Sequence, residues 1–594
     1  MPWDNLSEIW CADFEFQTEE KRDGGRPIPV CLVARGYHSN CLIRIWRDEL
    51  IGLRRAPFDT GPGAALCAYF ASAELGCFLT LGWPLPYNVI DLYAEFRLKN
   101  NNGPLDKHRS LTDVMRDNGL PFMSEAHKTE MRRLVTDQDE WSAEERKAIL
   151  DYCQEDTDAT VDLLARAQRF IDLPRSLLRG RYVAACARIE QTGIPLDVPV
   201  WNRITASRIP LLNRIVREED KPFGVYGDGL SWSDKRFDEL LRRRRISWPR
   251  TPGIGRPVLE KDTFERMCEV YPDLRPLLEL KHTIRMLMEP GLAIGPDDRN
   301  RIPVSPFGSK TGRNTPKARQ YIFGQARWLR GLIRPVPGRS LAYIDWEAQE
   351  IAIAAALSRD ERLLEAYLSG DPYLAFAVSV GLAPEGATKT SHMIIRDLCK
   401  VVYLATIFGQ TAVGLAARLR ISLFEAADLL RLHHDTYSTF WRWMERTVER
   451  ADLTGRIRTK LGWSMPITDD TSLNSLMNWP MQAHGAELMR LAAIAMTEAD
   501  VSVCTPVHDA FLIEALTSAV SGAVETSRAI MQQAGVSLLG IPIRTEANVF
   551  HYPERFRDDK DDAPQMWSRV MSRLIEIEGS SIIKGAEEGL YGCV

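Results

Sequence analysis

The chain lacks the features that mark several protein classes. Its 594 residues include 11 cysteines without a Cys-x-x-Cys pair, an odd count that argues against a disulfide scaffold or structural zinc. It has no run of about 18 apolar residues and no basic N-terminal segment followed by an apolar one, so we expect neither a membrane span nor a signal peptide. The sequence therefore predicts a soluble cytoplasmic protein with reduced thiols.

An excess of positive charge is also absent. The chain carries 75 Lys and Arg against 80 Asp and Glu, for a formal net charge of -5. Any polyanionic partner must therefore meet a local basic surface. The composition, 45% hydrophobic and 26% charged, is that of a globular protein and excludes a disordered or collagen-like chain. At roughly 150 residues per domain, the length predicts about three to five domains.

The patterning predicts an order of domains. Short strand-like runs at 9–16, 30–34 and 41–46 begin an α/β domain, and a helical pattern over 141–170, opened by a capping box of Ser142 and Glu145, closes it near residue 175. An Arg-rich and mostly helical module follows over 177–292. A second α/β domain then starts with a strand at 341–345 and a helix at 347–358; residues 391–450 are helical, and 501–514 is a strand pair interrupted at 506–509.

Acidic residues stand at unusual places in the first domain. Asp13 and Glu15 are two residues apart in an apolar run, so on a strand both side chains project from one face. Tyr152 and Asp156 share one face of the later helix, and Glu74 offers a further carboxylate. Carboxylates around two Mg²⁺ ions can activate water for attack on a phosphodiester. The pattern predicts nuclease chemistry; an exposed acidic edge strand is the alternative.

Three motifs carry a resemblance here. DFE at 13–15, Glu74 in an Ala-x-Ala-Glu-Leu context and YCQED at 152–156 resemble the motifs of proofreading 3′→5′ exonucleases of the DEDD type with tyrosine. The resemblance implies that Tyr152 orients the attacking water and that four residues ligate metal: Asp13, Glu15, Glu74 and Asp156. The second motif lacks the family's usual Asn, so Asp91 remains an alternative to Glu74 as the third carboxylate.

A second constellation lies in the C-terminal half. Asp345 ends the apolar strand LAYID, and His508-Asp509 interrupts another apolar strand, so two aspartates at adjacent strand ends could share a metal pair. Between them, one helix presents two cations and two apolar groups at steps of four: Arg396, Lys400, Leu404 and Phe408. Such a stripe suits a triphosphate and its base. The alternative is an amphipathic helix with a solvated basic edge.

These segments together resemble family A DNA polymerases, the bacterial DNA polymerase I type. DWEAQEIAIAAALSRD at 345–360, Arg396-x3-Lys400-x7-Phe408-Gly409 and Val507-His508-Asp509 match its three polymerase motifs. The resemblance implies that Asp345 and Asp509 hold two Mg²⁺ ions, which Mn²⁺ can replace, for in-line phosphoryl transfer. It implies that Glu350 is the steric gate against the ribose 2′-hydroxyl. It also implies a nucleotide site and a DNA contact set: Arg396, Lys400, Leu404, Phe408 and His508 for the nucleotide; Arg313 of SKTGR, Asn478 and Gln482 for primer and template.

The resemblance also implies the fold, a multi-domain α/β and α+β chain. Residues 1–175 would form a ribonuclease H-like 3′→5′ exonuclease domain, followed by a right-hand polymerase: 176–300 the helical thumb, 301–375 the first part of the palm, 376–450 the fingers and 451–594 the second part of the palm. No 5′-nuclease domain precedes the exonuclease, so the chain resembles the large fragment alone, as in bacteriophage replicases.

Three residues depart from the family pattern. Phe408 stands where the family has Tyr, Leu404 where it has an aromatic residue, and Ala510 follows Asp509 where it has Glu. Because both aspartates are present, we expect template-directed DNA synthesis to be retained. The resemblance further implies proofreading and a role in phage DNA replication, in the host cytoplasm. The expected partners are primer–template DNA, dNTPs and phage or host replication proteins, with no membrane. The alternatives are a 3′→5′ exonuclease with a degenerate polymerase half, which Phe408 and Ala510 favour, and a non-enzymatic protein with two exposed acidic patches.

Overall fold

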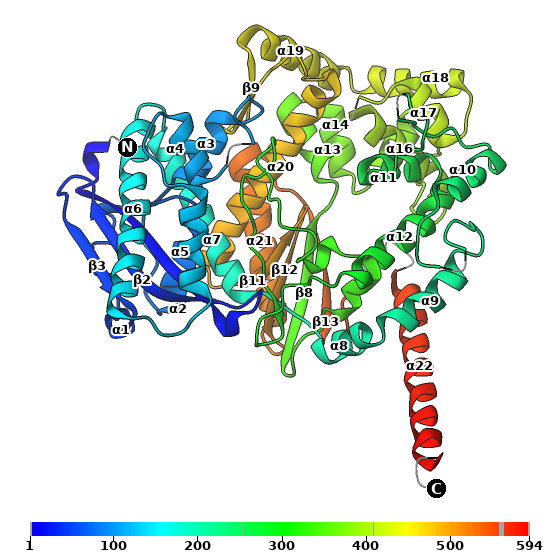
Figure 1. Ribbon diagram of the computed structural model, residues 1–594. Coiled ribbons are helices and arrows are strands. Elements are labelled where there is room, and N and C mark those ends of the chain that lie inside the picture. The colour runs from blue at the N-terminus through cyan, green and yellow to red at the C-terminus, as the bar shows by residue number, and fades with distance from the viewer. Residues whose placement is uncertain are drawn as a thin grey trace.

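The computed structural model describes residues 3–107, 109–227, 229–251, 253–407, 409–557 and 563–591. Figure 1 shows an N-terminal unit around one sheet, a central unit around a second sheet, helices on both sides of the second, and a last helix that projects away from the body. No helix among the described residues combines the length and the apolar character that crossing a membrane requires.

The first sheet has five strands in the order β3-β2-β1-β4-β5. The central strand β1 (Glu8–Thr18) pairs antiparallel with β2 (Pro27–Gly36) and parallel with β4 (Ala64–Ala68); β3 (Leu42–Trp46) and β5 (Val89–Asp91) are the edges. The three strands expected near the N-terminus are confirmed. Because β4 pairs only with residues 8–11 of β1, the rest of that side of β1 is left without a strand partner.

Helices cover both faces of this sheet. The capping box of Ser142 and Glu145 is present and begins α6 (Ala143–Ala167), which lies on β1 and β2. The even-numbered residues of β1 pack against α2 (Ser72–Thr80), whereas its odd-numbered residues pack toward α6. The remaining helices of the unit are α1 (Arg47–Leu50), α3 (Leu92–Asn100), α4 (Leu111–Asp117) and α5 (Glu125–Thr136).

Helix α7 (Leu173–Thr192) joins the two sheets. It packs against α2 and β5 on one side and against α20 (Leu473–Glu498) and β11 (Ser502–Val507) on the other. One hydrophobic core continues from the first sheet through α7 to the second sheet. The helix therefore crosses the predicted domain boundary at residue 175, which stays a prediction.

The Arg-rich module is helical, as expected, and its core continues into the second sheet through Leu341, Leu512 and Phe550. Phe237 and Phe264 stack at the centre of this core, with ring centroids 5.7 Å apart. The C-terminal helix α22 packs on α9 and so adds to this module. The helices are α8 (Val198–Ala206), α9 (Arg208–Glu219), α10 (Asp234–Arg243), α11 (Lys261–Val270), α12 (Arg275–Met288) and α22 (Ala563–Tyr591).

The second sheet is fully antiparallel, in the order β11-β12-β8-β13. Its central strands β8 (Arg339–Trp346) and β12 (Ala510–Leu516) include the expected strand at 341–345 and the second half of the expected pair at 501–514; β13 (Thr545–His551) is the outer neighbour of β8. The helices α13 (Gln349–Ser358), α20 and α21 (Val520–Leu539) pack around it.

The segment from 361 to 454 is a helical bundle, which confirms the helical pattern expected over 391–450. A short hairpin of β9 (Arg456–Arg458) and β10 (Ser464–Pro466) leads from it to α20. Phe408 lies outside the described residues. The bundle consists of α14 (Glu361–Leu368), α15 (Pro372–Ser379), α16 (Met393–Ile407), α17 (Ala412–Leu419), α18 (Leu423–Thr436) and α19 (Ser438–Thr454).

A glycine sets the closest approach between α7 and the first sheet. A Cβ at Gly180 would lie 1.9 Å from the carbonyl oxygen of Val89 in β5, so no larger side chain fits unless backbone moves. We expect Gly180→Ala to lower the free energy of unfolding by about 1–3 kcal/mol, the usual cost of overpacking. Gly522→Ala in α21, which would meet no atom within 4 Å, is the control and should be neutral or slightly stabilising. Urea denaturation of the full chain measures both, and equal stability of the two variants would contradict the prediction.

Candidate active sites

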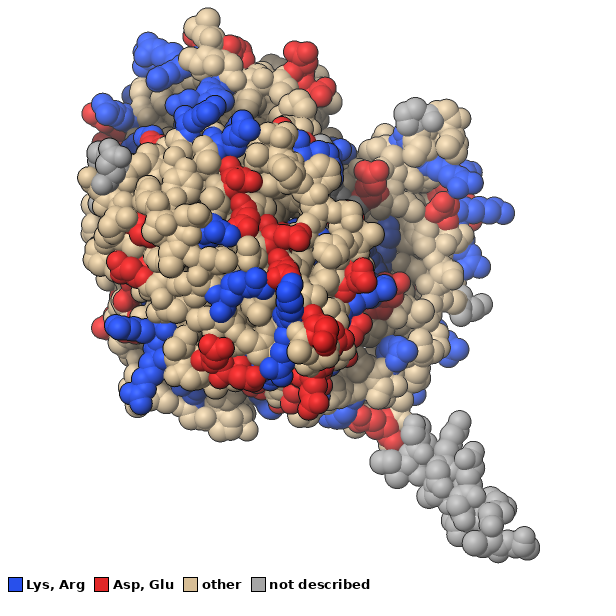
Figure 2. Space-filling view, turned by 60° about the vertical axis from the view of Figure 1, so that its left-hand side comes forward, with Lys and Arg blue, Asp and Glu red and all other residues tan. Residues whose placement is uncertain are grey.

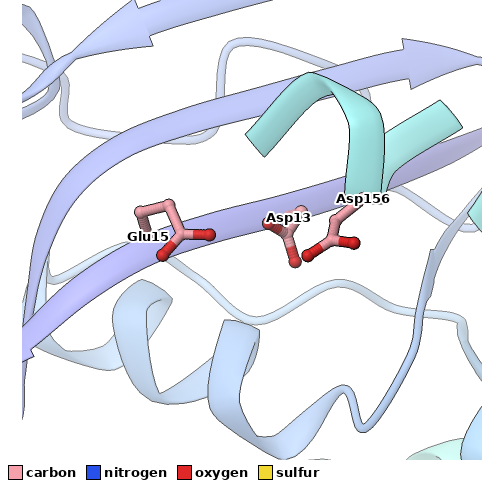
Figure 3. A group of neighbouring side chains, drawn as sticks. All are labelled: Asp13, Glu15 and Asp156. Carbon is pink, nitrogen blue, oxygen red and sulfur yellow. The ribbon is translucent and has the colours of Figure 1, made fainter. Parts of the chain in front are cut away.

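The first sheet and α6 bring three acidic residues together. Asp13 and Glu15 project from the same face of β1, and Asp156 comes from the helix that crosses this face (Figure 3). One carboxylate oxygen from each of the three lies within 4.8 Å of the others. This confirms that the two motifs, 140 residues apart in the sequence, meet in space. Oxygen ligands at this spacing suit Mg²⁺ or Mn²⁺.

Burial makes this cluster electrostatically costly. Burial raises the pKa of Asp13, and the charge of Asp156 raises it further. Burial likewise raises the pKa of Glu15 well above its usual value, with the charge of Asp13 as the next cause. Three carboxylates this close together, one buried and two half-buried, are therefore favoured in their charged form by a cation that offsets their charge, which is the condition that a metal site meets.

A lysine already supplies one such charge. Lys128 of α5 donates from Nζ to Asp156 Oδ1 at 2.9 Å, and the two side chains are only 8% and 11% exposed. The thiol of Cys153 also donates to Asp13, at 3.4 Å from its Oδ2. Our sequence reasoning missed Lys128. The available signal was its position on the apolar stripe of α5, where it is buried together with Met131 and Val135.

Glu74 and Asp91, the two candidates for the third carboxylate, lie in different surroundings. Glu74 of α2 reaches the unpaired side of β1, where its Oε2 accepts the N–H of Phe14 at 2.8 Å, and burial and Asp13 raise its pKa. Asp91 instead caps α3, accepting the N–H groups of Phe70 and Tyr93 at 3.1 and 2.9 Å. Glu74 therefore lies beside the cluster, whereas Asp91 has a local structural role. Glu74 nevertheless stands outside the set of oxygens that lie within 4.8 Å of one another.

Tyr152 lies one helical turn before Asp156. It is 3% exposed, and its ring meets that of His127 edge to face, with centroids 6.2 Å apart. Burial, followed by the charge of Glu15, raises the pKa of its phenol, so the hydroxyl stays protonated and can donate or accept a hydrogen bond. The shared face expected for Tyr152 and Asp156 is thus present beside the acidic cluster.

The second site lies where β8 meets β12. Asp345 is directly across from Ala510 in the ladder, and Asp509 forms the turn before β12 together with His508, whose φ is +54°. The N–H of Trp346 donates to the carbonyl of Asp509 at 3.1 Å, which ties the turn to the end of β8. The two aspartates are therefore neighbours, as the sequence predicted.

A further acid stands on the other side of Asp345. Glu546 of β13 is its partner in the antiparallel ladder, so both side chains project from one face of the sheet, and Glu546 is exposed. Our sequence reasoning did not select Glu546. Only the strand order, with β8 between β12 and β13, reveals this neighbour of Asp345.

Glu350 is held within a polar network. Its Oε1 accepts Nε2–H of Gln482 at 2.5 Å, and Arg313 and Asp509 lie near enough to influence its titration. Burial raises the pKa of Glu350, while the Arg313 guanidinium lowers it. Four residues expected at the polymerase site are therefore in one place. Asn478 lies one turn earlier on α20, and among the described residues its buried Oδ1 has no hydrogen-bond partner.

The cationic stripe on α16 is only partly available. Arg396 forms an ion pair with Asp371 and stacks over the ring of Tyr373 at 5.2 Å, so its charge is already compensated within the helical bundle. Lys400 is exposed, and Leu404 is half-buried. The predicted face therefore exists on α16 up to Leu404. A triphosphate at Arg396 would have to replace or share the contact with Asp371.

A large cleft adjoins the second site. It has a volume of about 730 Å³ and runs between α12 of the helical module and the second sheet. Cations line it from both sides, among them Arg275, Arg285, Arg313, Arg327 and Arg330, and His508 lies at its sheet side. The outer face of the N-terminal unit instead carries Lys, Arg, Asp and Glu intermixed (Figure 2). A chain of net negative charge thus concentrates arginines where a polyanion could bind.

The comparisons with known proteins concern this second site. Residues 314–551 match the family model described as DNA polymerase family A. This segment is similar to the corresponding segment of family A DNA polymerases. It contains Asp345, Glu350 and Asp509 and the whole of α16.

Individual relatives agree with this assignment. The chain is 25% identical over 409 residues to the DNA polymerase I of Aquifex aeolicus, covering 65% of this chain and 68% of that protein. It is 21% identical over 404 residues to the thermostable DNA polymerase I of Thermus aquaticus, covering 62% of this chain and 46% of the relative. The chain thus spans about half the length of the Thermus protein.

The fold likeness is wider. A solved complex of the POL domain of Pol1 from M. smegmatis with DNA primer-template and dNTP superposes with a TM-score of 0.66 at 19% identity, over 91% of this chain and 95% of that chain. The likeness in fold therefore extends beyond the matched segment and over most of the chain.

The lysine in the acidic cluster yields a prediction. Lys128→Met removes the cation beside Asp156, so without divalent metal the free energy of unfolding should fall by about 3 kcal/mol, the cost of breaking a buried ion pair. Because Mg²⁺ can replace the lost charge, the rise in melting temperature on adding Mg²⁺ should be larger in the variant than in the parent. Lys147→Met, which removes an exposed partner of Asp151 on α6, is the control and should change neither value. Thermal unfolding in EDTA and in Mg²⁺ measures both.

Proposed function

We propose that the chain is a DNA-dependent DNA polymerase that extends a primer on a template from dNTPs. One observation carries the proposal: Asp345 and Asp509 lie at abutting ends of β8 and β12, inside the family A segment and beside an arginine-lined cleft. Two carboxylates at that point suit the two-metal form of phosphoryl transfer.

The residues at the second site fit a pair of divalent cations. Asp345 and Asp509 would hold Mg²⁺, which, when bound, activates the primer 3′-hydroxyl and offsets the charge of the transferring phosphate. Glu546 lies next to Asp345 on the side opposite Ala510, so it offers a further carboxylate to a site in which Ala510 replaces the family's glutamate. The arginines of the cleft bind backbone phosphates without reading sequence, so binding should weaken as salt rises.

The other residues of the site select and place the substrates. Glu350, held by Gln482, occupies the position from which the gate would exclude a 2′-hydroxyl. Arg313 points its charge toward Glu350 and Asp509 and would donate to acceptors in the minor groove, which every correct base pair presents. Lys400 on the exposed face of α16, together with Arg396, Leu404, Phe408 and His508, would line the nucleotide site.

We propose proofreading for the N-terminal unit. Asp13, Glu15 and Asp156 form a set of half-buried and buried oxygens that fits divalent metal, with Glu74 beside them. Tyr152, one turn before Asp156, would orient the attacking water. The mixed sheet with the acids on its central strand supports a ribonuclease H-like fold. The reaction is removal of a nucleotide from the primer 3′ end by water.

The remaining parts of the proposal follow the right-hand arrangement. The Arg-rich helical module would be the thumb, the antiparallel sheet the palm, and the bundle of α14–α19 the fingers. By the same resemblance we propose a role in bacteriophage DNA replication in the host cytoplasm, with phage or host replication proteins as partners.

Three substitutions separate the activities. We expect Asp345→Ala and Asp509→Ala each to lower primer extension by about 10³-fold or more, since each removes a ligand of metals worth several kcal/mol of charge stabilisation, while 3′ hydrolysis persists. Asp13→Ala should have the reverse effect. A labelled primer–template with Mg²⁺, with and without dNTPs, measures both reactions on one gel. Loss of both activities in any one variant would contradict two separate sites, and shortening without extension in the parent would favour a nuclease with a degenerate polymerase half.

A fourth substitution tests the gate. Glu350→Ala should raise ribonucleotide incorporation relative to deoxynucleotide by about 10–100-fold, because it removes the group expected to occupy the space of the 2′-hydroxyl. Gln482→Ala, which only releases Glu350, should raise it by about threefold to tenfold, the value of one hydrogen bond. Single-nucleotide extension with rNTP and dNTP in parallel gives the ratio. An unchanged ratio for Glu350→Ala would show that the gate is another residue.

A further inference from the structure

The loop that carries Arg313 has an unusual backbone. Residues 305–313 connect the helical module to the second sheet without forming a helix or strand. Ser305, Phe307 and Gly312 have φ values of +51°, +60° and +75° in this loop, and the first two are not glycine. Such a conformation is costly for residues with a Cβ and persists only where the surroundings impose it. Contacts with other parts of the molecule must therefore hold the loop in this conformation.

Side chains of the N-terminal unit grip this loop. At the end of α3, Arg97 donates from Nε to the carbonyl of Phe307 at 3.4 Å and from Nη2 to that of Gly308 at 3.3 Å. The next turn places Asn101, whose Nδ2 donates to the carbonyl of Lys310 at 2.9 Å and to that of Ser464 at 2.8 Å. These donors lie more than 200 residues before the loop in sequence and belong to the unit with the acidic cluster.

The loop meets polymerase residues on its other side. The carbonyl of Lys310 also accepts the indole N–H groups of Trp463 and Trp479, at 3.1 and 3.2 Å, and that of Gly312 accepts Arg490 Nη1 at 2.9 Å. The ring of Phe307 stacks on Trp463, with centroids 5.2 Å apart. A Cβ on Gly312 would lie 2.9 Å from that indole. The loop is thus held between α3 and the second sheet, with Arg313 at its end.

Burial of the polar side chains of Arg97 and Asn101 costs free energy. Asn101 is fully buried, and among the described residues its Oδ1 has no hydrogen-bond partner, so the side chain is retained for its two N–H donors alone. Arg97 is 3% exposed, and its charge is offset by Asp106 at 2.6 Å. An apolar side chain would fill either position without these costs. The polar contacts to the loop therefore explain why these residue types stand there.

We propose that Arg97 and Asn101 are positioning residues for Arg313, so that the N-terminal unit sets how the polymerase site senses the primer end. The main-chain N–H of Arg313 donates to Ser309 Oγ at 2.9 Å, and the main-chain carbonyl of Ser309 accepts the N–H of Gly312. Both hydrogen bonds lie within the loop whose carbonyls accept from Arg97 and Asn101. A released loop would leave the guanidinium free to move away from Glu350 and Asp509. The proposal rests on the polymerase activity proposed above. It places two residues that influence this activity outside the segment that matches the family A model.

The first experiment measures the loop without any synthesis. Amide hydrogen exchange of residues 305–313 in the full chain should become about tenfold faster in Asn101→Leu, which keeps the volume and removes both donors. Arg97→Lys, which keeps the charge near Asp106 and loses the forked contact with two carbonyls, is the second variant and should act in the same direction. The control is Arg181→Ala, which breaks an exposed pair between α7 and Glu498 of α20 away from the loop. Unchanged exchange of 305–313 in both variants overturns the proposal.

The second experiment tests whether the effect passes through Arg313. Asn101→Leu should lower kcat/KM for dNTP on a matched primer end by about tenfold and leave extension of a mismatched end unchanged, because only a correct pair gives Arg313 its acceptors. In an Arg313→Ala background the same substitution should have no further effect. Equal losses in both backgrounds, or equal losses on matched and mismatched ends, overturn the proposal. A parent that extends no primer refutes the polymerase function instead, and the exchange result still decides whether α3 holds the loop.

Discussion

The register of β8 between its two neighbours is the constraint on which the second site depends. Alternate residues of β8 project from opposite faces, so Ile344 and Trp346 are buried on one face, while Asp345 is half-buried on the other, beside the exposed Glu546. A shift of one residue would bury the carboxylate and expose the tryptophan, at a cost far larger than the strand could tolerate. The hydrophobic core therefore fixes where the metal ligands stand.

The sequence alone predicted those elements whose residue pattern permits a single secondary structure. The capping box of Ser142, the alternation around Asp13 and the apolar run before Asp345 each predicted an element that the structure contains. The proximity of Asp345 and Asp509 followed from the motifs, and the ladder places Asp345 across from Ala510, the residue after Asp509. These features depend on residues close together in the sequence, or belong to motifs that the family resemblance already brings together.

Other features depend on contacts that no local pattern encodes. Lys128, Glu546 and Asn101 act on residues 28, 201 and 209 positions away, and each looks like an ordinary surface residue in the sequence. Their roles come from the crossing of α5 over α6, from the strand order and from the end of α3 meeting a distant loop. Of the three, only Lys128 could have been noticed in the sequence, because it shares a helix face with the apolar Met131 and Val135.

The two sites do not belong to loosely tethered domains. The core that begins at Trp10 in the first sheet includes Val183 of α7 and continues to Trp346 and Phe511 in the second. Since such a core resists small rearrangements, a displacement of α3 would be carried to the loop before Arg313 rather than absorbed at a linker. The N-terminal unit thereby holds the loop that carries Arg313 beside the second site, so the two units cannot be treated as independent of one another.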